Sequence, residues 1–135
     1  MRQITELSHK DAQVIIAAIA AELDRAGQGA AVAVVDPHGE LLALLRTDGC
    51  RLPSITIAIN KAYTAAREGI PSKQLGEISR EAGFPMTNFG ELRYVTWGGG
   101  VPIKVENAVV GAVGVSGLPE EEDMRLAALG IAALG

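Results

Sequence analysis

The sequence predicts an α+β fold in which helices pack on one antiparallel sheet. The expected order is a helix, a hairpin, two helices, a second hairpin and a last helix. Two hairpins separated by helices favour such a sheet. A chain of 135 residues is long enough to bury most of the surface that it exposes when unfolded. No repeat or low-complexity linker divides it, so we expect one domain over residues 1–135.

The helices are predicted from caps and apolar faces. Ser8 can cap the first helix, with Asp11 three residues later in a loose capping box. Ser72 can cap the third helix, after the break that Pro71 makes. Pro119 suits the first turn of the last helix, and the four acids that follow complement the helix dipole.

The strands are predicted from apolar runs that end at turns. Residues 36–39, Asp-Pro-His-Gly, match a type I turn, and Glu106-Asn107 makes the tight turn of the second hairpin. The return strand after Asn107 is apolar on both faces and should lie in a covered sheet. Its glycines at 111, 114 and 117 suggest that a helix, a second subunit or a ligand approaches the backbone closely.

The predicted elements are, in chain order, a helix from Ser8 to Gly27 or Gly29, strands Ala30–Asp36 and Glu40–Arg46, helices from Pro53 or Ser54 to Glu68 and from Ser72 to Ala82, an irregular loop Gly83–Arg93, a short strand Tyr94–Trp97, strands Val101–Val105 and Ala108–Ser116, and a helix starting at Pro119.

Two segments, Leu52–Ala66 and Leu126–Gly135, are more apolar than a monomer of this length needs. Lys61 is the only charge in the first, so that helix should be buried on nearly every side. Large apolar surfaces usually mark interfaces, which predicts a homo-oligomer.

Composition excludes several classes of function. A net charge of −4 without a basic run argues against a nucleic-acid partner. Cys50 is the only cysteine, so no intrachain disulfide or cysteine-based metal site is expected. His9 and His38 are expected at the surface, and no metal site is predicted. The chain lacks a signal-peptide core and any run of 18 apolar residues, so we expect a cytoplasmic protein that contacts no membrane.

Lys61 and Arg46 are the candidate catalytic residues. A lysine on an apolar helix either extends its amine to water, or is a desolvated base or anion ligand. Arg46, at a strand end, forms either an anion clamp or a salt bridge to Asp36.

The segment around the glycine run supplies most of the other candidates. Trp97 directly precedes Gly98, Gly99 and Gly100 and can line a pocket beside them. Asp123 lies one turn into the last helix and can point back toward the Gly117 turn.

Several segments together resemble the GlcG/HbpS-like family, described as haem-binding or haem-degrading and related to the C-terminal domain of PduO. The matching segments are Val32–Arg46 (VAVVDPHGELLALLR), Asp48-Gly49, Ser54-Ile55 with Ala58 and Lys61–Ala65 (KAYTA), Pro71-Ser72, Gly98–Ile103 (GGGVPI), Gly111–Gly117 (GAVGVSG) and Asp123. The resemblance implies a profilin-like fold with an antiparallel sheet of about five strands, and a homo-oligomer. Some relatives bind haem, and others are encoded beside glycolate, glycerol or propanediol metabolism.

We therefore expect a small-molecule-binding protein that is accessory to a metabolic pathway. The expected ligand-binding residues, besides Lys61 and Arg46, are Tyr63, Trp97, Gly98, Gly99, Gly100, Ser116 and Asp123. One alternative is an enzyme acting on a small carbonyl or carboxylate compound. Lys61 would be its base or electrostatic catalyst, and the Gly98–Gly100 amides would stabilise an oxyanion. The other alternative is a haem-binding protein.

Overall fold

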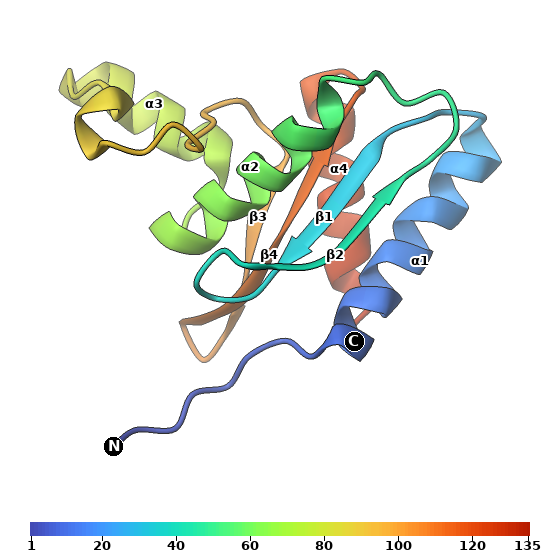
Figure 1. Ribbon diagram of the computed structural model, residues 1–135, viewed down its shortest axis with the longest axis horizontal. Helices are drawn as coiled ribbons and strands as arrows, with labels where there is room; N and C mark the ends of the chain where they lie inside the picture. The colour runs from blue at the N-terminus through green and yellow to red at the C-terminus, as the bar shows by residue number, and fades with distance from the viewer.

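Four antiparallel strands form the sheet at the centre of the computed structural model, which describes residues 1–135 (Figure 1). The strand order is β2-β1-β4-β3, so the two hairpins join through the pairing of β1 with β4. The elements are α1 (His9–Ala26), β1 (Ala31–Val35), β2 (Leu41–Arg46), α2 (Ser54–Glu68), α3 (Ser72–Ala82), a 3₁₀ turn η1 (Met86–Phe89), β3 (Gly100–Val105), β4 (Ala108–Ser116) and α4 (Glu120–Ala132). The predicted α+β class is confirmed.

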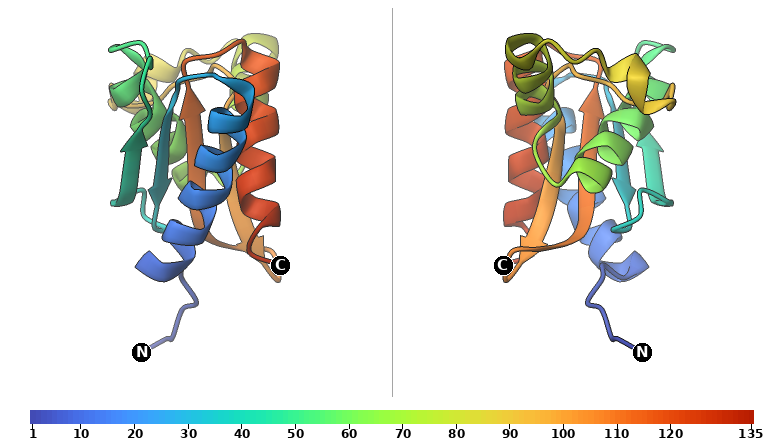
Figure 2. Two further views of the ribbon diagram at one scale, coloured as in Figure 1. Left: turned by 90° about the vertical axis from the view of Figure 1, so that its right-hand side faces the viewer. Right: turned by 90° about the vertical axis from the view of Figure 1, so that its left-hand side faces the viewer.

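Helices cover both faces of the sheet, as the side views in Figure 2 show. On one face, α1 and α4 pack against large aliphatic side chains such as Val34 and Val113. On the other face, α2 packs against a cluster made mostly of alanines, which includes Ala33, Ala58 and Ala112. Because successive strand residues point to opposite faces, the continuous apolar runs of β1 and β4 supply both clusters.

Two glycines of β4 leave room for close neighbours, and at Gly114 the neighbour is a helix. A methyl group added at Gly114 would collide with the carbonyl oxygen of Ala58 in α2, and one at Gly111 would lie 2.6 Å from the carbonyl oxygen of Val35. The sequence left open whether a helix, a second subunit or a ligand approaches the backbone at these glycines. At Gly114 this neighbour is helix α2.

The sheet has four strands, close to the expected number of about five, but the predicted strand Tyr94–Trp97 is not formed. The backbone N–H of Val95 donates a 2.9 Å hydrogen bond to Thr64 Oγ1, a side chain of α2. The segment is therefore held against a helix, away from any strand partner.

Local signals fixed most element ends. Ser8 and Asp11 form the predicted capping box, with Ser8 Oγ accepting from the Asp11 N–H at 3.1 Å. Glu106 and Asn107 take φ values of 52° and 68°, as the tight hairpin turn requires. Ser72, in contrast, is not a cap: it is the first residue of α3, and Pro71 holds the cap position. Pro119 likewise holds the cap position of α4 instead of lying inside its first turn.

Helix α2 is buried on nearly every side over residues 61–66, which are all buried, as predicted. Within the helix only Thr56 and Arg67 are exposed, whereas Leu52, just before it, is 71% exposed. None of the helices combines the length and the apolar character that crossing a bilayer requires.

Candidate functional site

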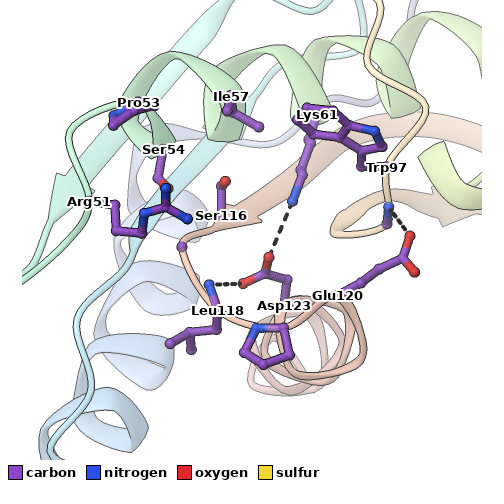
Figure 3. Close-up of a pocket in the computed structure, with 13 residues that line it drawn as sticks. Arg51, Pro53, Ser54, Ile57, Lys61, Trp97, Ser116, Leu118, Glu120 and Asp123 are labelled. Carbon is purple, nitrogen blue, oxygen red and sulfur yellow. Dashed lines mark hydrogen bonds and ion pairs between the residues drawn. The ribbon is translucent and has the colours of Figure 1, made fainter.

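A cavity of about 830 Å³ opens between the start of α2 and the start of α4 (Figure 3). Its lining residues come from three parts of the chain: Arg51, Pro53, Ser54, Ile57 and Lys61 in and before α2; Trp97 and Gly98 before β3; and Ser116, Gly117, Leu118, Pro119, Glu120 and Asp123 from the end of β4 into α4. The cavity therefore lies where the close contact between α2 and β4 ends.

Lys61 and Asp123 form a buried ion pair at this cavity. Lys61 Nζ donates to Asp123 Oδ2 at 3.2 Å and to the carbonyl oxygen of Val115 at 3.0 Å. The two side chains are 4% and 3% exposed. The other carboxylate oxygen of Asp123 accepts from the Leu118 N–H at 3.2 Å. Of the alternatives for Lys61, the structure thus excludes an amine extended to bulk water.

Two glycines, Gly99 and Gly100, leave the space in which Lys61 lies. A methyl group at Gly99 would lie 2.9 Å from Lys61 Nζ, and one at Gly100 would collide with the backbone carbonyl of Lys61. Gly99 also has a φ of +127°, which L-residues with side chains rarely adopt. These two glycines are needed for the close contact between β3, β4 and α2.

Burial sets the electrostatics of the pair. Desolvation raises the pKa of Asp123 to about 6, against the opposing effect of the Lys61 ammonium. The carboxyl group therefore titrates close to neutral pH, where a group can both accept and return a proton.

Glu120 occupies the other side of the cavity. Its Oε1 accepts from the Gly98 N–H at 2.6 Å, and its Oε2 lies 3.5 Å from Lys73 Nζ. The Gly98 N–H, and to a smaller extent Lys73, lower the pKa of Glu120. The glutamate is thus held as an anion with its charge compensated.

The backbone amides of the glycine run are largely used within the protein. Gly98 N–H donates to Glu120, and Gly100 N–H donates to Ser72 Oγ at 2.9 Å. Ser72 Oγ also donates to the carbonyl oxygen of Trp97 at 2.6 Å. Two of the three amides of the predicted oxyanion site are therefore bonded to other protein groups, and Ser72, proposed only as a cap, organises the segment.

Four of the predicted site residues do not line the cavity, namely Arg46, Tyr63, Gly99 and Gly100. Arg46 is exposed at the end of β2, paired in register with Ala31. It forms no salt bridge with Asp36, which follows Val35 at the opposite end of the hairpin. Arg51 supplies the guanidinium that lines the cavity. Ser54 was missed as well, although it lies seven residues before Lys61 and hence on the same helix face.

Tyr63 joins α2 to the segment between α3 and β3 instead of lining the cavity. Its hydroxyl donates to Glu91 Oε1 at 2.9 Å, and the Arg93 guanidinium lies 3.9 Å from the centre of its ring. Burial is the main cause of its raised pKa. Of the predicted residues, the structure brings together Lys61, Asp123, Ser116, Trp97 and Gly98 around one cavity.

The fold is that of a class of small α+β proteins with several solved members. A double mutant of Streptomyces reticuli HbpS superposes with a TM-score of 0.90 at 31% identity, covering 100% of this chain and 91% of that one. A PduOC–haem complex superposes with a TM-score of 0.88 at 26% identity, covering 96% and 95%.

The sequence comparison agrees with the structural one. The model of the family described as "Haem degrading protein HbpS-like" matches residues 7–132, and the chain belongs to this family. Protein GlcG of Escherichia coli K12 is 37% identical over 116 residues, which cover 82% of this chain and 81% of GlcG.

The lining of the cavity does not fit haem held through a histidine or a cysteine. No histidine, cysteine, methionine or tyrosine lines it, and Lys61 and Asp123 are bonded to each other. His38 lines a separate cavity of about 470 Å³. No group of three or more histidine, cysteine, aspartate or glutamate side chains is placed to hold a metal ion.

Proposed function

We propose that this protein is a homo-oligomer that binds a small molecule in the cavity between α2 and α4, as an accessory to a metabolic pathway. The observation that carries the proposal is the buried Lys61–Asp123 pair at an open cavity of about 830 Å³. Ligand pockets typically enclose about 300–1,000 Å³ and carry a few fixed polar groups.

Self-association is supported by apolar side chains near the mouth of the cavity. Leu52 is 71% exposed and Trp97 is 63% exposed. We expect Leu52→Asp to shift the sedimentation coefficient toward the monomer, and Leu92→Asp, at a 95% exposed residue, to serve as a matched control. A wild-type chain that sediments as a monomer would refute this part of the proposal.

The ligand site is tested by filling the cavity. A compound screen followed by amide NMR mapping should find ligands that shift the signals of Ser54 and Ser116. Ile57→Trp, which fills the cavity, should abolish these shifts, whereas Leu44→Trp on the exposed strand β2 should preserve them. Ligands that map elsewhere and bind Ile57→Trp normally would contradict the proposal.

A catalytic role is the second candidate, supported by the pKa of Asp123 at about 6 beside an amine. In that case Lys61, with Asp123, would move a proton to or from a bound carbonyl or carboxylate compound. Lys61→Met should then abolish turnover of the bound compound, while a binding protein would show no turnover in either form.

Haem binding is the third candidate, supported by the haem complex of the structural relative PduOC. A titration should produce a Soret band if haem binds. If His9→Ala/His38→Ala retains the band with an unshifted maximum, the ligand is not a histidine.

A further inference from the structure

Two serine hydroxyls that line the cavity have no partner within the protein. Ser54 and Ser116 are each only 5% exposed, and neither Oγ makes a hydrogen bond to another protein group. In the view of Figure 3 both hydroxyls lie at the same end of the cavity as Arg51. No buried side-chain oxygen or nitrogen of the protein lacks a hydrogen-bond partner, so these two free hydroxyls must open to the cavity, where they can donate to polar atoms of a ligand.

The same end carries the one uncompensated charge of the lining. Lys61 is paired with Asp123, and Glu120 is paired with Lys73 and the Gly98 N–H. The Arg51 guanidinium has no ion pair and no hydrogen bond within the protein. A single unpaired cation beside two hydroxyl donors matches a monoanion, and a guanidinium binds a planar carboxylate through two parallel N–H donors.

The rest of the cavity combines apolar surface with charges that are already paired, those of Lys61, Asp123 and Glu120. Ile57 lines it from α2, and Trp97, 63% exposed, lines its rim. A flat ligand body can stack on the indole face there. The lining therefore offers free cationic and hydroxyl donors around Arg51, and apolar contact surface at Ile57 and Trp97.

We propose that the cavity takes an organic monocarboxylate with a flat apolar body. The carboxylate binds Arg51, Ser54 and Ser116, and the body packs against Ile57 and Trp97. This assignment rests on the proposed function, namely that the cavity is the ligand site.

Benzoate is the probe for this assignment, with benzamide as its neutral isostere and phenyl phosphate as a dianion of similar body. Dissociation constants are measured on the full chain by amide NMR titration at pH 7.5. Because a charge-assisted hydrogen bond contributes about 1.5–3 kcal/mol, benzoate should bind about tenfold or more tightly than benzamide. Phenyl phosphate should bind no better than benzoate.

Variants test whether the proposed residues cause the preference for benzoate over benzamide. Arg51→Gln should reduce the benzoate-to-benzamide ratio to near one, and Ser54→Ala/Ser116→Ala should weaken benzoate severalfold. Arg46→Gln is the matched control, since Arg46 is exposed and outside the cavity; it should leave the ratio unchanged.

Equal binding of benzoate and benzamide, tighter binding of phenyl phosphate, or an equal effect of Arg46→Gln would overturn the assignment. If other compounds still occupy the cavity in an Ile57-dependent way, only the carboxylate assignment falls. If no compound binds there, the proposed function falls with it.

Discussion

Lys61 Nζ lies 3.2 Å from Asp123 Oδ2, although the two residues are 62 positions apart in the chain. The contact joins α2 to α4 across the end of β4, and both side chains are almost fully buried. It is thus the link between the two helical layers at the cavity.

Breaking this pair from one side should be costly. Lys61→Met or Asp123→Leu alone leaves the other charge buried without its partner, which typically costs about 3–5 kcal/mol. Lys61→Met/Asp123→Leu removes both charges and should lose clearly less than the sum of the single losses, as measured by urea unfolding at pH 7.5. Additive losses would show that the two charges are not coupled.

The pH dependence of stability should carry the signature of Asp123. Its pKa in the folded protein, about 6, exceeds the ordinary value of 3.8, so the folded state binds the proton more tightly than the unfolded chain. The stabilisation is therefore complete below pH 3.8 and is lost as pH rises through 6, by roughly 1–3 kcal/mol.

The measurement is the free energy of unfolding of the wild type minus that of Asp123→Asn, from pH 4 to 8. This difference should fall as pH rises to about 6 and then level off. A difference that rises over the same range would show that the pairing with Lys61 outweighs burial.

Gly114→Ala should disrupt the packing of α2 on the sheet. The new methyl group would meet backbone atoms of Ala58 and Ala62 that no side-chain rotation can move away. We expect a loss of about 3 kcal/mol or more in the free energy of unfolding. Gly83→Ala, which has a positive φ but open space around it, should cost only about 1 kcal/mol. Equal losses would contradict the close contact.

Ser72→Ala should loosen the segment between Trp97 and Gly100. The buried Gly100 N–H loses its acceptor, so its hydrogen exchange should accelerate, and stability should fall by about 1–3 kcal/mol. Ser79→Ala removes a comparable 2.6 Å hydrogen bond to the carbonyl oxygen of Phe84 at the far end of α3. That control should leave exchange at Gly100 unchanged.

Tyr63→Phe should affect stability but not ligand binding. It deletes the hydrogen bond to Glu91 and leaves the ring on which Arg93 stacks, for a loss of about 0.5–1.5 kcal/mol. Weakened binding of a cavity ligand in this variant, with normal binding in Tyr94→Phe, would show that Tyr63 contributes to the site.

The features predicted best from the sequence depend on neighbouring residues. The Ser8–Asp11 cap and the Glu106-Asn107 turn are each fixed within four residues. The position of Asp123 near the Gly117 turn could also be predicted from neighbouring residues, because Asp123 lies one helical turn beyond that turn. These signals do not need the rest of the fold.

The errors depend on contacts between distant segments. Tyr94–Trp97 has the residue types of a strand. Its Val95 N–H, however, donates a hydrogen bond to the Thr64 hydroxyl of α2 instead of to a neighbouring strand. Arg46 and Arg51 are five residues apart, and only the path of the chain from β2 into α2 decides which one faces the cavity. No local pattern distinguishes these two arginines.

The direct contact between the backbones of α2 and β4 at Gly114 limits which substitutions this protein can accept. Backbone meets backbone there, so the contact between α2 and β4 tolerates almost no change in side-chain size at Gly114. Arg51 and Trp97 lie at exposed positions, where substitution leaves the contact between α2 and β4 intact. Substitutions at these two rim residues would therefore change the shape and charge of the cavity entrance while the scaffold stays fixed, which makes the rim the place to alter the proposed ligand site.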